Sequence, residues 1–265
     1  MAGKSERLLY VDPKYRVRDS IDKGMDSLLL RTVKEIETWG SEENIPRNGK
    51  LVLGFAPHNG WLEVIVIDHF LRKIRGDRRG AVWITKKENE ADLPVWITGN
   101  RRFIYVEREF PKPATIRTID RVLNEEGIAA SAFEGTRYGT GDRKGGDILS
   151  LGEFKPGLVY FASRCNALIL PVVVLGADKV LPSPEKIREK YGIKGVLREL
   201  AKKIIMGDDR IEVLFLPAYG GHLYKEDPTL KRDEFLQYHT QVISREVVSE
   251  ITRLNPQYPL GYYLG

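Results

Sequence analysis

The stretch Lys50-Leu-Val-Leu-Gly-Phe-Ala56 runs directly into Pro57-His58-Asn59-Gly60-Trp61-Leu62-Glu63. After Lys50 the first half is apolar without alternation, which is typical of a strand that is covered on both faces of a sheet. Asn59-Gly60 is a strong turn signal, and an amphipathic stretch over about residues 62–75 follows it. This succession of strand, turn and helix is the unit from which α/β domains are built.

The same alternation of short apolar runs and longer amphipathic stretches recurs along the chain. Further strands are predicted at Ala81–Thr85, Phe103–Val106, Ile128–Phe133, Ala167–Leu175 and Ile211–Leu216. Further helices are predicted at about 112–126, 155–165, 184–206 and 231–254. Strands that alternate with helices predict an α/β fold with a mixed, largely parallel central sheet flanked by helices.

Residues 1–45 differ from the rest and are predicted to form an N-terminal helical segment, with the α/β domain spanning 46–265. Asp19 or Ser20 can cap a helix whose apolar positions are Ile21, Met25, Leu28, Leu29, Val33, Ile36 and Trp39. Such an amphipathic helix either packs on the core or lies on a membrane surface. Ser41 to Gly49 then serves as the linker.

The totals exclude several classes of protein. No apolar core of a secretory signal and no run of about 18 apolar residues is present, so we expect a cytoplasmic protein that does not cross a membrane. A formal charge of +5 favours anionic partners in general. Cys165 is the only cysteine and the histidines lack ligand-like spacing, so we predict no disulfide and no metal site.

His58 is the first candidate for chemistry, because the ends of strands are where α/β folds place ligand sites. Glu63 lies five residues later, which on a continuous helix puts the two about 140° apart. The turn at Asn59-Gly60 allows them to meet. Glu63, in the first helical turn, then orients the imidazole of His58, which acts as the general base. The alternative for this pair alone is a structural or solvated role.

Two further strand ends carry charged residues. Phe133-Glu134-Gly135-Thr136-Arg137 offers close backbone approach, a hydroxyl and a guanidinium fork for phosphate, or else a buried turn with a surface arginine. Glu107-Arg108 follows the strand at Phe103–Val106. This pair of an acid and a base either has a functional role or is a solvated strand end. Ser131 lacks the G-x-S-x-G elbow of an exposed nucleophile.

Taken together, these blocks resemble the glycerolipid acyltransferase family, the 1-acylglycerol-3-phosphate acyltransferases among them. That family is marked by H-x4-D, a block ending in V-x-R, F-P-E-G-T-R and an apolar run with a central proline. The counterparts are His58-x4-Glu63, Gly99–Arg108, Ala132–Arg137 and Leu168-Ile-Leu-Pro171-Val-Val, within about residues 50–220. Two positions depart from the pattern, since Glu63 replaces an aspartate and Phe133 replaces a proline.

The resemblance implies a glycerol-3-phosphate acyltransferase-like fold and O-acyl transfer in phospholipid biosynthesis. His58 and Glu63 are then catalytic, and the substrate-binding set is Arg108, Glu134, Gly135, Thr136 and Arg137. The acyl group comes from acyl-CoA or acyl-carrier protein, with no cofactor. The acceptor is a lysophosphatidate-like lysolipid at the cytoplasmic face of a membrane, and nucleic acid is not a partner. Alternatives are another lysolipid, a lipid-linked sugar or an amine as acceptor, or a basic lipid-binding module without turnover.

Overall fold

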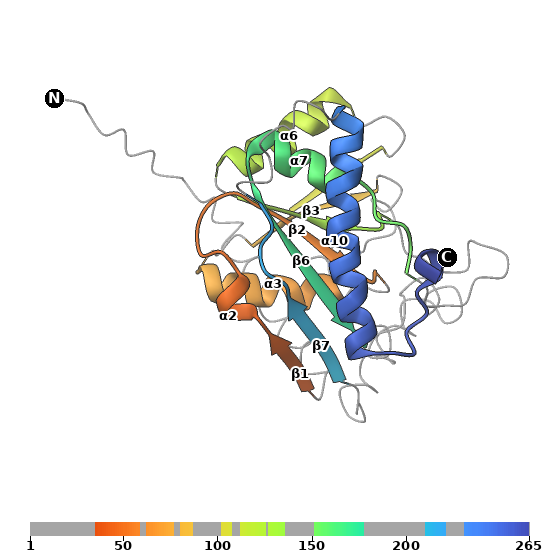
Figure 1. Ribbon diagram of the computed structural model, residues 1–265. Helices are drawn as coiled ribbons and strands as arrows, with labels where there is room; N and C mark the ends of the chain where they lie inside the picture. Colours follow the sequence, from red (N-terminus) through yellow and green to blue (C-terminus); the bar gives the residue numbers. More distant parts are fainter. Residues whose placement is uncertain are drawn as a thin grey trace, which may run out of the picture.

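One seven-stranded sheet organises the computed structural model, which describes residues 35–58, 62–76, 80–86, 102–107, 112–125, 127–135, 151–177, 210–220 and 231–264. The strand order is β1-β7-β6-β2-β5-β3-β4 (Figure 1). The strands are β1 (Glu35–Trp39), β2 (Leu51–Ala56), β3 (Val82–Lys86), β4 (Arg102–Val106), β5 (Ile128–Ala132), β6 (Leu168–Leu175) and β7 (Arg210–Phe215).

The strands β6, β2, β5, β3 and β4 run parallel to one another. At one edge β7 pairs antiparallel with β6, and β1 pairs parallel with β7. The predicted mixed, largely parallel sheet is therefore confirmed.

Helices cover both faces of this sheet. Helix α3 (Leu62–Arg75) packs on one face, while α6 (Pro113–Asn124), α7 (Gly157–Cys165) and α10 (Arg232–Leu254) pack on the other (Figure 1). In β2, Leu51, Leu53 and Phe55 face the α3 side, and Val52 and Ala56 face the opposite side. All six residues of β2 are buried, which is why this strand is apolar without alternation.

The connections that leave β2 and β5 diverge. These two strands are parallel neighbours, but the chain leaves β2 for α3 on one face and reaches α7 on the other face after β5. Adjacent parallel strands with diverging connections leave a crevice at their carboxyl ends, which is where open α/β sheets bind ligands. His58 and Glu134 lie just beyond these two ends.

From residue 50 onward, the predicted elements are confirmed wherever the structure describes them. Helix α3 matches its predicted range, and the strands and the other helices agree within two residues at each end. The predicted helix at 184–206 lies outside the described residues.

The N-terminal prediction is wrong for residues 35–39, which form the strand β1 rather than the end of a helix. Ile36 and Trp39 are spaced for a helix face, but all five residues pair in register with β7 and extend the sheet. Long-range strand pairing has overridden the local periodicity. A short helix, α2 (Ser41–Asn44), occurs within the predicted linker. Residues 1–34 lie outside the described part of the chain, so the rest of that helix stays a prediction.

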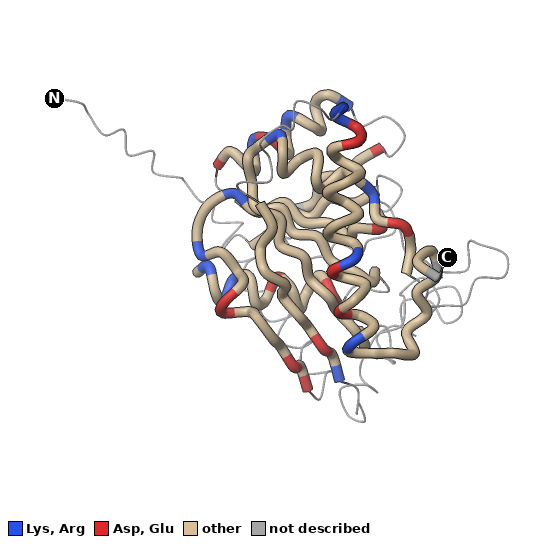
Figure 2. The backbone as a smooth tube through the Cα atoms, in the orientation of Figure 1, with Lys and Arg blue, Asp and Glu red and all other residues tan. Residues whose placement is uncertain are grey.

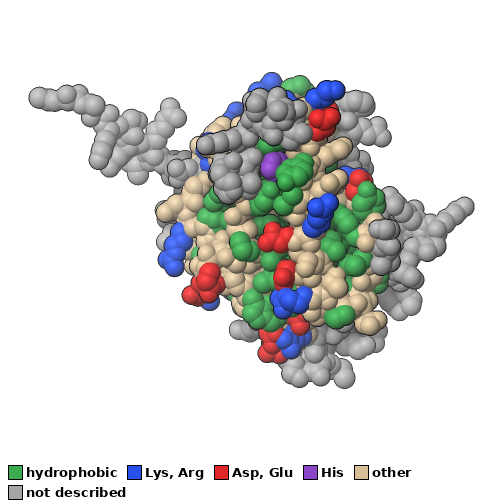
Figure 3. Space-filling view, in the orientation of Figure 1, with side chains coloured by type: hydrophobic (Ala, Val, Ile, Leu, Met, Phe, Trp, Pro, Cys, Tyr) green, Lys and Arg blue, Asp and Glu red, His purple; other side chains and the backbone are tan. Residues whose placement is uncertain are grey.

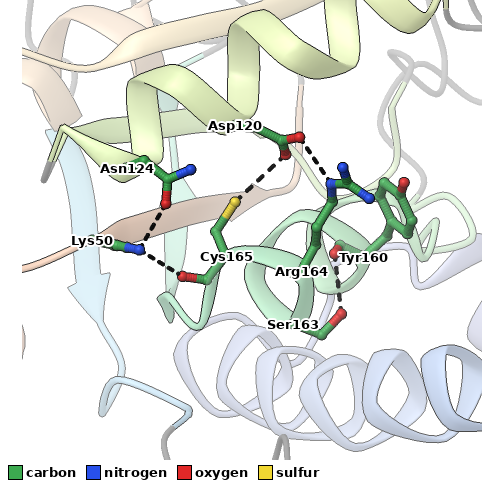
Figure 4. Close-up of polar contacts among 7 residues, drawn as sticks. All are labelled: Lys50, Asp120, Asn124, Tyr160, Ser163, Arg164 and Cys165. Atoms are coloured by element: carbon green, nitrogen blue, oxygen red, sulfur yellow. Dashed lines mark hydrogen bonds and ion pairs between the residues drawn. The ribbon is translucent and has the colours of Figure 1, made fainter.

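A polar cluster connects α6 and α7 to Lys50, which directly precedes β2 (Figure 4). The cluster therefore lies at the amino end of β2, and His58 lies beyond its carboxyl end. Lys50 Nζ donates to Asn124 Oδ1 at 2.8 Å and to the carbonyl of Cys165 at 3.1 Å. Asp120 accepts from Arg164 Nε at 2.8 Å and from the Cys165 thiol at 3.5 Å. Burial raises the pKa of Cys165 to about 11, so this thiol is kept protonated and poorly nucleophilic.

The surface mixes charges of both signs. Lys and Arg are interspersed with Asp and Glu along the described backbone and over the face that carries α10 (Figures 2 and 3). Among the described helices, none combines the length and the apolar character needed to cross a bilayer.

Gly54 of β2 packs closely against Phe133. A Cβ at this position would overlap the ring of Phe133, which is 2% exposed and stacks on Phe154 at 4.8 Å with an interplanar angle of 3°. The missing side chain of Gly54 therefore makes room for an aromatic pair directly before Glu134.

We expect Gly54→Ala to lower the free energy of unfolding by about 1–3 kcal/mol, because overpacking forces neighbouring groups to shift. Urea unfolding followed by circular dichroism measures the change. Gly157→Ala is the matched control, since a Cβ there meets nothing within 4 Å. Equal stability of the Gly54 variant and the wild type would show that the Phe133 ring is not tightly held.

Candidate active site

His58 lies two residues beyond β2, after a cis Ala56–Pro57 peptide bond. Its ring is half-buried and meets the ring of Phe55 edge-on, with the centroids 5.2 Å apart. Phe55 in turn contacts Trp83 of β3 at 6.0 Å. An aromatic wall on the α3 side of the sheet therefore supports one side of the imidazole.

Glu63 is the second residue of α3 and is fully buried. A carboxylate in the first turn of a helix is stabilised by the helix dipole. The structure thus places Glu63 where the sequence predicted it, in the helix that follows His58. The turn predicted at Asn59-Gly60 lies outside the described residues.

Glu134 is 1% exposed and follows β5 by two residues. Its Oε1 accepts the backbone N–H of His58 at 3.0 Å, and its Oε2 accepts the backbone N–H of Gly152 at 3.0 Å. Both carboxyl oxygens are thus bound to main-chain donors from distant segments. Glu134 therefore fixes the backbone that carries His58.

The pKa of Glu134 is raised to about 8, mainly by burial and to a smaller extent by the charge of Glu63, against the lowering effect of the two N–H bonds. Glu63 lies in the first turn of the helix that follows β2, and Glu134 lies just beyond β5, the parallel neighbour of β2. An imidazole and two buried carboxyl groups therefore gather at the carboxyl ends of β2 and β5. Such a set is suited to accepting and returning a proton.

Gly135 is exposed and has a φ of 62°. A Cβ there would meet only Lys155 Cγ, at 3.8 Å. Glycine is therefore favoured here by the left-handed backbone conformation rather than by lack of space. This turn ends the run that began in β5.

The other predicted site residues, Arg108, Thr136 and Arg137, lie outside the described residues. The structure reaches Glu107 at the end of β4, where its side chain pairs with Lys112 at 3.0 Å. Ser131 is engaged within the sheet, since its hydroxyl donates to the carbonyl of Ile84 at 3.0 Å. Among the described residues, no three His, Cys, Asp or Glu side chains are grouped so as to hold a metal ion.

Sequence reasoning missed the part played by residues 151–155. Gly152 contributes a backbone N–H to Glu134, and the N–H of Lys155 donates to the carbonyl of Phe133 at 2.9 Å. A main-chain donor leaves no trace in residue type or spacing, so no side-chain pattern reveals it. The one signal in the sequence is Phe154-Lys-Pro-Gly157, which resembles the family's segment that leads into the apolar run with a central proline.

Comparison with known proteins bears on the family and on the fold. The sequence profile of the family described as Acyltransferase matches residues 38–175, just over half of the chain. The fold is similar to that of the 1-acyl-sn-glycerophosphate (LPA) acyltransferase PlsC from Thermotoga maritima. That likeness has a TM-score of 0.52 and 15% identity, over 91% of this chain and 84% of the other. No curated protein matches the chain. The structural likeness supports the fold, and the profile match shows that this chain belongs to the acyltransferase family.

Proposed function

We propose that this acyltransferase moves a fatty acyl group from acyl-CoA or acyl-carrier protein to the hydroxyl of a lysophosphatidate-like glycerolipid. The observation that carries the proposal is the gathering of His58, Glu63 and Glu134 at the ends of β2 and β5. Family membership supports acyl transfer as the reaction class. The named activity of the Thermotoga maritima protein supports the choice of acceptor.

In the proposed mechanism His58 removes the proton from the acceptor hydroxyl as its oxygen attacks the thioester carbonyl. The tetrahedral intermediate collapses, the C–S bond breaks, and the imidazolium returns the proton to the leaving thiolate. The products are an ester and a free thiol. No acyl-enzyme forms, so the reaction needs no nucleophilic side chain.

Glu63 and Glu134 support the base in different ways. Glu63 steadies the imidazolium from the first turn of α3, where the buried environment strengthens their attraction. Both oxygens of Glu134 accept backbone N–H groups. We therefore propose that Glu134 serves the substrate site by fixing its backbone and does not itself contact the substrate. Backbone N–H groups around residues 59–62, where α3 begins, are our candidates for stabilising the oxyanion, because the first N–H groups of a helix have no partner within the helix.

We assign binding of the acceptor phosphate to Arg108 and Arg137. Arginine offers a planar fork of donors that matches phosphate, and both residues follow strands that end at the same edge of the sheet as β2. Gly135 turns the chain and Thr136 helps to order this pocket. A lipid acceptor also places the protein on a membrane surface, which we propose to be the cytoplasmic face.

We expect His58→Ala to lower kcat about 10²–10⁴-fold, the usual contribution of a general base. Glu63→Gln is expected to lower kcat with little change in the acceptor KM, because the substrate does not contact Glu63. The assay supplies acyl-CoA with a panel of acceptors and follows thiol release by a chromogenic disulfide. Buried Cys165 adds little background to this signal.

The matched control is His69→Ala, an exposed histidine on α3, which is expected to leave kcat unchanged. Full acceptor-dependent activity in His58→Ala would refute the proposed base. Turnover only with another lysolipid, a lipid-linked sugar or an amine would keep the chemistry and replace the acceptor.

We expect Arg137→Gln, and Arg108→Gln separately, to raise the acceptor KM about tenfold or more, because each removes charge-assisted hydrogen bonds to phosphate. Initial rates at a range of acceptor concentrations give the KM. Arg121→Gln, an exposed position in the last turn of α6, is the control. An unchanged KM in both variants would point to an acceptor without phosphate.

The raised pKa of Glu134 also predicts how stability depends on pH. Folded Glu134 keeps its proton up to about pH 8, whereas the unfolded carboxyl loses it near 4.5. Between these values the folded state binds more protons, so stability falls as pH rises, by up to about 1.4 kcal/mol per pH unit.

Urea unfolding at pH 5, 6, 7 and 8 measures this slope in the wild type and in Glu134→Gln. The variant is expected to be less stable overall, because an amide cannot accept both N–H bonds, and to show a flatter slope. Glu153→Gln, the neighbour of Gly152, is expected to keep the wild-type slope. Parallel slopes for wild type and Glu134→Gln would show that Glu134 is already ionised at pH 5.

A further inference from the structure

The C-terminal segment after α10 lies against residues 151–154, which lead into α7 (Figure 1). The N–H of Leu151 donates to the carbonyl of Pro259 at 3.1 Å, and the N–H of Tyr262 donates to the carbonyl of Leu151 at 3.1 Å. Leu151 is fully buried. The main chain of Leu151 is therefore bound on both sides by the last residues of the protein.

Tyr263 adds a third bond. Its hydroxyl accepts the N–H of Phe154 at 3.1 Å, and its ring meets that of Phe154 edge-on with the centroids 5.8 Å apart. Tyr263 thus holds Phe154 by a hydrogen bond and by ring contact at once, at the position whose ring stacks on Phe133.

These contacts matter for the site because residues 151–155 supply the Gly152 N–H to Glu134. Within this segment, three main-chain hydrogen bonds go to the C-terminal residues, one goes to Glu134 and one to Phe133. The C-terminal residues thus contribute most of the main-chain bonds that the structure describes here.

Phe133 shows how the same contacts reach β2. Its N–H donates to the carbonyl of Phe55 at 3.0 Å, and a proline, as in the family pattern, has no N–H to donate. The Phe133 ring rests on Phe154, which Tyr263 holds. In this chain an aromatic stack anchored by the C-terminus occupies the position where the family has a proline.

We propose that the C-terminal segment 258–264, through Tyr263, is a positioning element for His58. The path runs from Tyr263 to the 151–155 segment, from Gly152 to Glu134, and from Glu134 to the backbone N–H of His58. This assignment rests on the proposed function, since it gives His58 the base to be positioned. Small displacements of a catalytic group reduce turnover steeply.

The test compares Tyr263→Phe with Tyr262→Phe in the full chain. Tyr263→Phe keeps the ring but removes the acceptor for Phe154 N–H, whereas Tyr262 is 60% exposed and its hydroxyl makes only a 3.5 Å contact with Glu153. Hydrogen exchange is measured at the amides of Gly152 and His58, with β6 as the internal reference. Steady-state kinetics give kcat and the acceptor KM.

We expect Tyr263→Phe to exchange about tenfold faster at both amides, as loss of a buried hydrogen bond predicts. Exchange in β6 is expected to stay unchanged, which separates a local effect from a global loss of stability. The kcat is expected to fall roughly tenfold at unchanged acceptor KM, because positioning of the base is impaired rather than binding. Tyr262→Phe is expected to match the wild type in every measurement.

Unchanged exchange at His58 in Tyr263→Phe would overturn the inference, whatever the activity. Faster exchange with unchanged kcat would also overturn it, because the segment would then support the fold and not the base. Absence of turnover in the wild type with every acceptor would instead refute the proposed function. In that case the exchange data still decide whether the segment holds the backbone of His58.

Discussion

The carboxyl group of Glu134 joins two chain segments that lie far apart in the sequence. One oxygen binds the N–H of His58 beyond β2, and the other binds the N–H of Gly152 on the approach to α7. Burying a carboxyl group is costly unless hydrogen bonds compensate it, and the two N–H donors provide that compensation. Glu134 therefore helps to fix the backbone that carries the imidazole, and the cost of its burial is visible in its raised pKa.

The strand order brings Glu134 to His58. The chain passes from β2 through β3 and β4 and returns through α6, so that β5 lies between β2 and β3. Gly54 gives the Phe133 ring room, and the bond from Phe133 N–H to Phe55 continues the pairing beyond the end of β5. Glu134 is thereby held just beyond the end of β5, where its side chain faces the backbone of His58 rather than solvent.

The parts of the fold that follow from local pattern were predictable. The strand β2 is apolar because both of its faces are buried, and α3 has a clear amphipathic period after a turn signal. The strand β1 was missed because its structure depends on pairing with β7, far along the chain. His58 and Glu134 were each predicted from the ends of strands and from the motifs, but their contact spans 76 positions and requires β2 and β5 to be neighbours. The role of Gly152 was hidden because only its backbone acts.

The different roles that we propose for the carboxyl groups of Glu63 and Glu134 suit a mechanism in which His58 is the base. An imidazole beside two charged carboxylates holds its proton more tightly than one beside a single carboxylate, and a base that keeps its proton cannot take another from the acceptor. Burial raises the pKa of Glu134 to about 8, so in the proposed mechanism Glu134 adds no charge beside the imidazolium at neutral pH, and we assign that role to Glu63. Environment thus assigns different roles to groups of the same type. In the proposed mechanism the longer Glu63 side chain, which stands in place of the family's aspartate, stabilises the imidazolium from the first turn of α3, where the helix dipole also favours a negative charge.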